Sequence, residues 1–331
     1  MNRRPFLPSF AHSFRGFAAL SLLMAAVTGL AHAEDVWPSK PIRFIVPFGP
    51  GGSNDIVARA VAEAASKQLG QTIVIENKPG AGSALGADYV ARSAPDGYTF
   101  LTPAAGVITN FMIRKHLSYK EDDLVPVVMM AVSPSVIVVP PNSPIQDLKG
   151  LIAASKKGVG LNFSTAGTGS TPHFVAEMLK LKAGAHMQII PYKSGSEGVT
   201  AVISGQVDAT SEGSPVVLPM IRAGRLKAIA STWNRRIAAL PDLPTAEEQG
   251  FKDIVIGHWT GVFAPRGTPD AILDKMNAAV NAALKSVDLR GRLIPLAIDP
   301  VGGSREDFRK FLAAEKARLG PVARAAQMQE D

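Results

Sequence analysis

The hydrophobic positions of this chain alternate between short runs typical of buried strands and longer segments with helical spacing. An apolar run at 42–46, broken only by Arg43, precedes the sequence PFGPGGSND at 47–55, and Ala and Val recur at helical spacing over 56–69. This order predicts a strand, a glycine loop and a helix. The loop would expose backbone N–H groups, and the helix would point its unpaired N–H groups and positive dipole end at the same place. The stretch therefore favours an anionic ligand.

The same order recurs at two later places. A β-branched run at 72–76 leads into the loop NKPGAGS at 77–83, and the run LNFS at 161–164 leads into TAGTGSTPH at 165–173. A segment with helical spacing follows each loop. Three glycine-rich connections from strand to helix are thus predicted, and the third falls in the second half of the chain.

Strands and helices continue to alternate up to the C-terminus. Repeated β–α units predict mostly parallel sheets covered by helices, with ligands at the carboxyl ends of the strands. A chain of 331 residues is too long for one compact core and about right for two. Further strands are predicted at 98–102, 126–139, 188–192, 207–210, 226–231 and 257–263, and further helices at 145–156, 197–204, 216–223, 269–287 and 305–319.

Two of these strands are candidates for crossing between lobes. The apolar segment 126–139 is interrupted by Ser133-Pro134-Ser135, and a break there suits the passage from one lobe to the other. The strand at 257–263 would carry the chain back. We therefore expect an α/β protein with two lobes and a ligand cleft between them.

The N-terminal segment 1–33 has the pattern of an export signal. Basic residues precede an apolar stretch at 17–30, which ends in the small-x-small sequence Ala31-His32-Ala33. The apolar stretch is shorter than the roughly 20 residues that span a bilayer, and no later segment qualifies. The pair Arg3-Arg4 also fits a twin-arginine signal. We expect a soluble protein that is exported by a cleavable signal and acts in the periplasm.

Charge and cysteine content exclude several classes. The net charge of +7 includes three arginines and no acids in the signal, which leaves +7 − 3 = +4, and no basic cluster suggests nucleic-acid binding. The absence of cysteine excludes disulfides, thiol catalysis and thiolate metal sites. His173 and Glu177 stand four residues apart, but zinc needs a third protein ligand, so we expect a surface or capping pair. No metal or cofactor is expected.

Short motifs along the mature chain together resemble one family. The motifs are WPSKPIR at 37–43, the loop at 47–55, ENKPGAG at 76–82, APDGYT at 94–99, the loop at 165–173, PYK at 191–193, GQVD at 205–208, LPT at 243–245 and WTG at 259–261 followed by APRGTP at 264–269. Their order resembles that of the extracytoplasmic solute-binding proteins of tripartite tricarboxylate transporters, the Bug (Bordetella uptake gene) family, over essentially the whole mature chain.

The resemblance implies a type II periplasmic-binding-protein fold, with two α/β lobes joined by two crossing strands. The first lobe would comprise 34–135 plus 258–331, and the second lobe 136–257. Such proteins act as monomers that close on a carboxylated solute and present it to the membrane permease subunits of an ion-driven transporter. They hold the carboxylate through loop N–H groups, hydroxyls and ordered water, often without an arginine.

The resemblance also assigns ligand contacts, position by position. Loop amides and hydroxyls from both lobes would grip the solute, and no residue would be catalytic. The first lobe would contribute Phe48, Gly49, Gly51, Gly52, Ser53, Gly82 and Ser83. The second lobe would contribute Thr165, Gly167, Thr168, Gly169, Ser170, His173, Tyr192 and Asp208.

Several of these positions have an alternative interpretation. Asp55 suits a helix cap better than a ligand contact, because an acid there accepts unpaired N–H groups. Tyr192 suits the core equally well, and Asp208 would either meet a ligand amine or hold the hinge. Trp259 favours packing between the lobes over stacking on a ligand. Where the family usually has Gly after Tyr-Lys, this chain has Ser194, which puts the contacts to the distal part of the ligand in doubt.

Two other classes of function were weighed against solute binding. An extracytoplasmic hydrolase of a carboxylate ester lacks a Gly-x-Ser-x-Gly elbow and a motif partner for any histidine. A nucleotide or phosphate binder lacks the lysine of the P-loop motif. The predicted cleft contains few basic residues, which favours one or two carboxyl groups over three. Citrate-like acids, short dicarboxylates, amino acids and aromatic acids such as terephthalate all fit loops that hold a carboxylate through backbone groups.

Overall fold

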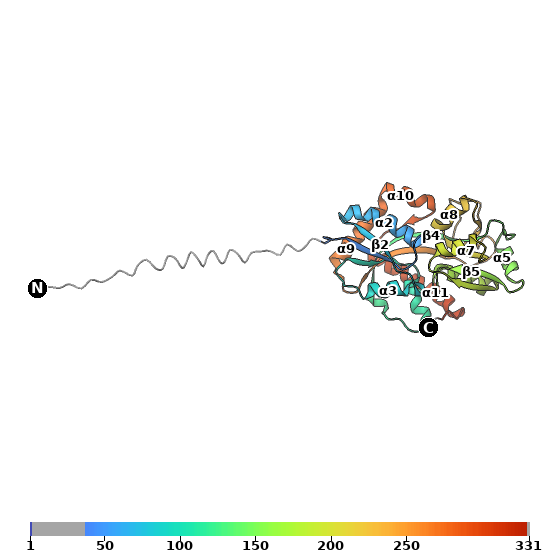
Figure 1. The fold of residues 1–331 in the computed structure, drawn as a ribbon, viewed down its shortest axis with the longest axis horizontal. Coiled ribbons are helices and arrows are strands. Elements are labelled where there is room, and N and C mark those ends of the chain that lie inside the picture. The colour runs from blue at the N-terminus through green and yellow to red at the C-terminus, as the bar shows by residue number, and fades with distance from the viewer. Residues whose placement is uncertain (2–36, 330–331) are drawn as a thin grey trace. The chain divides into compact units, whose positions relative to one another are not determined.

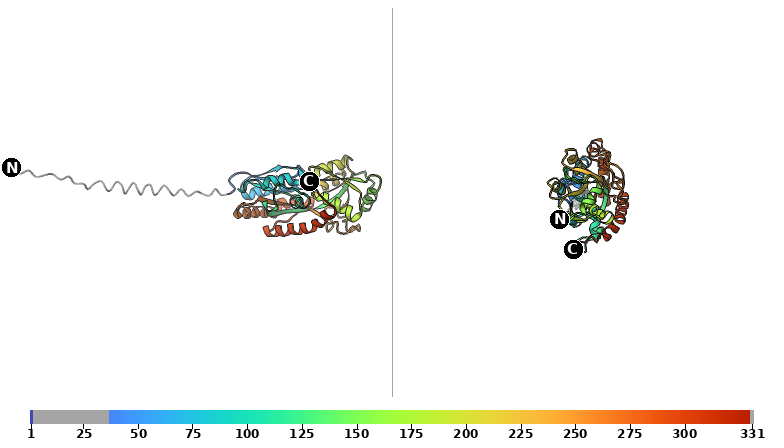
Figure 2. Two further views of the ribbon diagram at one scale, coloured as in Figure 1. Left: turned by 90° about the horizontal axis from the view of Figure 1, so that it is seen from below. Right: turned by 90° about the vertical axis from the view of Figure 1, so that its right-hand side faces the viewer.

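The computed structural model describes Met1 and residues 37–329. The predicted export signal lies, apart from Met1, outside the described residues. From Lys40 onward the chain forms one unit of contacts, and Figures 1 and 2 show its helices and strands.

Three short parallel strands begin this unit. β1 (Ile42–Val46) lies between β2 (Ile73–Asn77) and β3 (Thr99–Leu101). Every residue of β1 except Arg43 is buried, as a strand inside a parallel sheet requires. Figure 1 shows α2, α3, α9 and α10 around these strands. The helices of this half are α2 (Ser53–Leu69), η1 (Ala81–Ser83), α3 (Ala84–Ala91), α4 (Gly106–Ile113), η2 (Glu121–Asp123), α9 (Asp270–Lys285), α10 (Val287–Leu293), η3 (Ile294–Leu296) and α11 (Arg305–Ala325).

A second set of strands follows the same plan. β5 (Leu161–Thr165) lies between β6 (Met187–Pro191) and β7 (Ala209–Gly213) and is parallel to both. Figure 1 shows α5, α7 and α8 around these strands, at the other end of the unit from α9. The helices of this half are α5 (Leu148–Ser155), α6 (Thr171–Ala183), α7 (Gly195–Ile203) and α8 (Ser214–Arg222).

One long strand joins the two sets. β4 (Leu124–Val139) pairs antiparallel with β9 (Gly257–Pro265) as far as Pro134, and from Ser135 onward it pairs with β7 and β8 (Lys227–Ser231). β10 (Asp299–Pro300) also pairs with β4. The sequence predicts an interruption around Pro134, but the strand runs through. Proline lacks an N–H group and is tolerated here because it stands where the partner strand changes.

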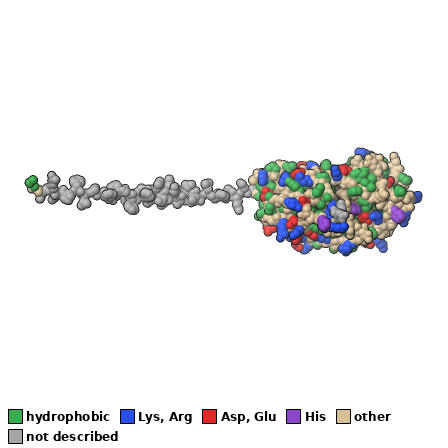
Figure 3. Space-filling model, turned by 60° about the horizontal axis from the view of Figure 1, so that its bottom comes forward, with side chains coloured by type: hydrophobic (Ala, Val, Ile, Leu, Met, Phe, Trp, Pro, Cys, Tyr) green, Lys and Arg blue, Asp and Glu red, His purple; other side chains and the backbone are tan. Residues whose placement is uncertain are grey.

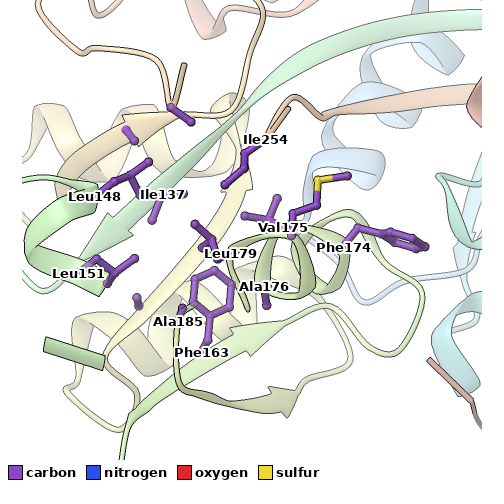
Figure 4. Close-up of a cluster of buried hydrophobic side chains, with 14 of the residues drawn as sticks. Ile137, Leu148, Leu151, Phe163, Phe174, Val175, Ala176, Leu179, Ala185 and Ile254 are labelled. Carbon is purple, nitrogen blue, oxygen red and sulfur yellow. The ribbon is translucent and has the colours of Figure 1, made fainter. Parts of the chain in front are cut away.

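Buried apolar side chains form separate clusters in the two halves. Trp259 and Phe308 belong to one cluster, and Phe163 and Phe174 belong to another, which Figure 4 shows between α6 and the neighbouring strands. The helix α11 begins in the first cluster with Phe308 and ends in the second with Leu319. It therefore packs against both halves.

Charged side chains are spread over the surface of this unit. On the face drawn in Figure 3, basic and acidic side chains are interspersed. That face presents no extended area of one charge.

Candidate ligand cleft

The loops that follow β1, β2, β5 and β6 meet at one cavity. Each loop stands at the carboxyl end of a parallel strand, where ligands of open α/β sheets bind. The cavity has a volume of about 410 Å³. The residues that line it are Pro47, Phe48, Gly80, Ala81, Gly82, Ser83, Ala166, Gly167, Thr168, Pro191, Tyr192, Lys193 and Glu197.

A much smaller cavity, which we call the deep compartment, adjoins this main cavity. It has a volume of about 20 Å³, and Phe48 and Ala166 line both spaces. A volume of this size holds about one water molecule or one small polar group. Its other lining residues are Gly52, Ser53, Asn54, Ala104, Ser170, Thr171, Pro172, Gly195, Glu212 and His258.

Three helices begin at the deep compartment. α2 starts at Ser53, α6 at Thr171 and α7 at Gly195, and each of these residues lines it. The first N–H groups of a helix have no partner within the helix, and the helix dipole places partial positive charge there. Of these helices, α2 and α6 begin where a glycine-rich loop ends, whereas α7 begins after the short connection at 192–194. The cleft therefore offers N–H donors from both halves of the protein.

The loops of the two halves touch across the cleft. The backbone N–H of Gly49 donates to the carbonyl of Lys193 at 3.1 Å. The hydroxyl of Thr109 donates to the carbonyl of Gly169 at 2.8 Å, and that of Ser196 donates to the carbonyl of Pro50 at 2.9 Å. These bonds hold the two halves in a closed arrangement.

A buried polar network connects the two halves behind these loops. Ser53 Oγ donates to Glu212 Oε1 at 2.8 Å, and Oε1 also accepts the N–H of Gly213 at 2.8 Å. His258 Nδ1 lies 3.6 Å from the same oxygen. Glu212 and His258 are 2% and 6% exposed. The network thus joins α2 of one half to β7 of the other half and to the crossing strand β9.

Burial controls the protonation of the histidine in this network. Burial lowers the pKa of His258 below its ordinary value of 6.5, and the neighbouring Glu212 opposes this shift only in part. The imidazole is therefore neutral at neutral pH. Its Nε2 lies 3.3 Å from Ser135 Oγ, which in turn lies 2.7 Å from Ser211 Oγ.

The structure brings most of the predicted site residues together. Phe48 lines both cavities. In the main cavity it is joined by Gly82, Ser83, Gly167, Thr168 and Tyr192, and in the deep compartment by Gly52, Ser53 and Ser170.

Three of the predicted glycine amides already have partners within the protein. Gly49 N–H bonds to Lys193 as described above, Gly51 N–H donates to Asp55 Oδ2 at 2.9 Å, and Gly169 N–H donates to His173 Nδ1 at 3.0 Å. These amides shape the loops. His173 was expected in a surface or capping pair; it is 9% exposed, so the surface position is wrong, while its bond from the Gly169 N–H at the start of α6 fits the capping role.

Asp55 stabilises the first loop from the start of α2. Its carboxylate also accepts hydrogen bonds from Arg59 and Asn77. Burial would raise the pKa of Asp55, but the bonds from Arg59, Gly51 and Asn77 bring it below its ordinary value of 3.8. Asp55 therefore supports the helix start, as expected, although the capping position itself is Gly52, which has no side chain.

Two further predicted site residues, Thr165 and Asp208, lie outside the cavity linings, as does Trp259, for which packing was favoured over ligand contact. Thr165 ends β5, and its hydroxyl is buried without a hydrogen-bond partner. Asp208 Oδ2 accepts the N–H of Asn162 at 2.8 Å. Asn162 is near the start of β5, at the opposite end from Thr165, so Asp208 ties strands together and is left out of the site. Trp259 packs edge to face on Phe308 in the core.

Sequence reasoning missed Glu212 and His258. The strand predicted at 207–210 stops short of Glu212, whereas β7 continues to Gly213. The only available signal was an acidic residue among small ones in the sequence ATSEG at 209–213. His258 adjoins the motif at 259–261, yet nothing in the sequence showed that it would face Glu212.

In the described part of the chain, no group of three or more His, Asp or Glu side chains is placed to hold a metal ion. No helix there is both long and apolar enough to cross a bilayer.

Two α/β lobes, two crossing strands and a cleft lined by glycine loops define a binding protein of the periplasmic type. Residues 57–328 match the family model TctC, the tripartite tricarboxylate transporter family receptor. The chain belongs to this family of solute-binding receptors. It is 36% identical to the protein BugT of Bordetella pertussis over 308 residues, which cover 91% of this chain and 94% of BugT. The resemblance to the Bug family is confirmed.

Solved structures of relatives show the same fold. One is Rpa4515 of R. palustris with adipate, which has a TM-score of 0.84 and 32% identity and covers 88% of this chain and 98% of its own. Another is MatC of Rhodopseudomonas palustris with bound malate, which has a TM-score of 0.83 and 32% identity and covers 86% of this chain and 99% of its own. The predicted fold class is confirmed.

Proposed function

We propose that this receptor captures a small carboxylate with one or two carboxyl groups by closing its lobes, and delivers it to a tripartite tricarboxylate-type permease. The observation that carries the proposal is the cavity of about 410 Å³ where glycine loops and helix N-termini of both lobes meet. Relatives with bound adipate and malate support the same ligand class.

Backbone groups supply the chemistry of capture. Ala81, Gly82 and Ser83 have left-handed φ values of 47°, 55° and 81°, and successive N–H groups of a turn can bind an anion. The Ser83 N–H already donates to the carbonyl of Gly80, so we assign the anion to the N–H groups of Ala81 and Gly82. Thr168 faces them from the other lobe. Charge-assisted hydrogen bonds are worth about 1.5–3 kcal/mol each, so a few from each lobe support micromolar affinity after the cost of closure.

The charge and size of the cleft limit the ligand. Among the residues that the structure describes, Lys193 is the one Lys or Arg lining either cavity. Three carboxylates would meet a single fixed cation, whereas one or two suit it together with the loop amides. A volume of about 410 Å³ is at the low end for ligand pockets and fits a short aliphatic or a single-ring aromatic acid.

The division of the chain into two lobes allows the cleft between them to close around a ligand. We assign 34–135 and 258–331 to the first lobe and 136–257 to the second, with the end of α11 reaching the second core. The change of partner along β4 at Ser135 supports this division.

We also assign the protein to the periplasm as a monomer, with export directed by the signal pattern at 1–33. Its partners in this assignment are the membrane subunits of the transporter.

A hydrolase is the competing class, and one arrangement bears on it. Ser135, His258 and Glu212 follow one another like the members of a Ser-His-Glu relay. Ser135 is fully buried on β4 and lines neither cavity. A substrate in the cleft would not reach its hydroxyl, so this arrangement does not favour hydrolysis.

Thermal unfolding of the exported protein against mono-, di- and tricarboxylates, amino acids and aromatic acids tests the proposal. A ligand at 100 times its Kd stabilises the folded state by about 2.7 kcal/mol, so we expect at least one mono- or dicarboxylate to raise the Tm. Ser83→Ala and Thr168→Ala should weaken that ligand in calorimetry, while Ser204→Ala, at the end of α7, should not. A flat response to every acid, or turnover of nitrophenyl esters, would contradict the proposal.

A further inference from the structure

The deep compartment is lined by polar groups that are not needed to bind a carboxylate. Thr171 lines it and is 2% exposed, and its hydroxyl Oγ1 is buried with no hydrogen-bond partner in the described part of the chain. A buried hydroxyl left unpaired costs free energy. The closed protein therefore keeps an unpaired hydroxyl in the wall of a compartment of about 20 Å³.

The compartment also presents a buried acceptor. Glu212 lines it, and the hydrogen bonds from Ser53 and Gly213 both go to Oε1. The other oxygen, Oε2, lies against Gly195 at the start of α7, where a methyl group would overlap it. An acceptor is thus available beside the compartment that Thr171 also lines.

Donors and acceptors together select one kind of occupant. Glu212 accepts hydrogen bonds, whereas the first N–H groups of α6 and α7 donate them, and the Thr171 hydroxyl does both. A carboxylate would face Glu212 with no proton to share, and an ammonium group would face the positive ends of the helices. A hydroxyl group donates and accepts, and its volume suits the compartment.

We infer that the deep compartment receives a hydroxyl substituent of the ligand, with Glu212 as its acceptor, so that the protein selects hydroxycarboxylates over the unsubstituted acids of equal length. This inference rests on the proposed function, because the carboxylate of the same ligand is held in the main cavity. Phe48 and Ala166 line both spaces, so the two spaces adjoin, and in this assignment one short molecule extends from the main cavity into the compartment.

Matched ligand pairs measured by calorimetry test the inference. The pairs are lactate and propionate, malate and succinate, and 2-hydroxyglutarate and glutarate, with alanine and aspartate as the ammonium arm. A hydrogen bond to a charged group contributes about tenfold or more in affinity. We expect the hydroxy acid of the best-bound length to bind at least about tenfold more tightly than its unsubstituted partner and more tightly than the amino acid.

Variants then assign the preference to the compartment. Glu212→Gln keeps the shape of the side chain but removes its negative charge, so the hydrogen bond from Ser53 is no longer charge-assisted. We expect this loss to weaken the binding of all ligands by the same factor. The ratio of the two Kd values within a pair isolates the hydroxyl contact, and we expect it to fall from about tenfold to within about threefold. Thr171→Val should lower the same ratio and provides a second variant if Glu212→Gln does not fold.

The control is Glu315→Gln, which alters another largely buried carboxylate, paired with Arg318 on α11. It should leave the ratio unchanged. Equal affinity within every pair, tightest binding of an amino acid, or a ratio unaltered by both Glu212→Gln and Thr171→Val would each overturn the inference while leaving carboxylate capture intact. Failure of every acid to bind would instead overturn the proposed function, and the inference with it.

Discussion

Ser53 Oγ and Glu212 Oε1 lie 2.8 Å apart, and this bond joins the start of α2 to β7 across the cleft. Both residues are buried, at 5% and 2% exposure. A hydrogen bond to a carboxylate out of reach of water is stronger than one on the surface. Ser53 was predicted as a ligand contact, and in the closed structure its hydroxyl instead ties one lobe to the other.

Replacing Ser53 by alanine should therefore favour the open arrangement. Loss of this bond costs about 1.5–3 kcal/mol, which shifts the balance between closed and open forms about tenfold or more. We expect Ser53→Ala to increase the radius of gyration of the ligand-free protein in small-angle scattering and to weaken carboxylate binding. Ser204→Ala, whose hydroxyl bonds only to the carbonyl of Ala201 in its own helix, is the control. An unchanged radius and an unchanged Kd would contradict the assignment.

Gly82 and Thr168 define how closely the lobes approach. Gly82 has φ 55°, and a methyl group there would overlap the carbonyl oxygen of Thr168 in the other lobe. We expect Gly82→Ala to weaken carboxylate binding by more than about tenfold, because the lobes can no longer close fully. Gly158→Ala is the matched control, since Gly158 has a similar φ of 57° with no atom within 4 Å of the added carbon. Both variants should lose about 1–2 kcal/mol of stability from the left-handed backbone, but only Gly82→Ala should lose affinity. Similar affinities in calorimetry would show that this approach is not needed for binding.

The sequence predicts the repeated strands, the glycine loops and their meeting place because these depend on local patterns. Apolar runs such as 42–46 and the glycines around Ser53 act within a few residues, and parallel strands bring their carboxyl ends to one edge. Local patterns do not predict strand register. The sequence places Asp208 at a strand end, whereas in the structure it stands at the start of β7 and accepts a hydrogen bond from Asn162, away from the cleft.

Contacts between distant segments account for the rest. Glu212 and His258 are 46 residues apart in the chain and meet only because β7 and β9 both flank β4. The sequence offers no local pattern for such a pair. The orphaned hydroxyl of Thr171 is likewise visible only once its surroundings are known.

The stability of the protein should fall as the pH drops below about 6.5. Burial lowers the pKa of His258 in the folded state, so in this range the unfolded chain binds a proton that the folded protein does not. The contribution of His258 is fully present above its unfolded pKa of 6.5 and is lost as the pH falls toward the folded pKa, by up to about 1.4 kcal/mol per pH unit. Urea unfolding between pH 7.5 and 5 measures this slope.

His258→Asn removes the titrating group and should flatten that part of the curve. Asp55→Asn provides the contrast, because the pKa of Asp55 is lowered from 3.8 and its contribution is lost only at more acid pH. A slope between pH 6.5 and 5 that is the same in the parent and in His258→Asn would exclude His258 as its source.

Phe308 should be among the most costly side chains to remove, because it packs beneath the crossing strand β9. It is 1% exposed and meets Trp259 and Phe263 edge to face, at ring separations of 5.9 and 5.2 Å. Gly261 on β9 leaves room for the ring, since a methyl group there would overlap it. Phe308→Ala should lower the free energy of unfolding by about 3–5 kcal/mol, from lost burial and the remaining cavity. Phe311→Ala removes the same atoms from a partly buried neighbour in the same helix and should cost clearly less.

Because α11 packs against both cores, we expect Phe308→Ala to unfold in one transition at lower urea, with both lobes lost together. Equal losses for the two variants, or a separate early transition, would show that β9 does not depend on this packing.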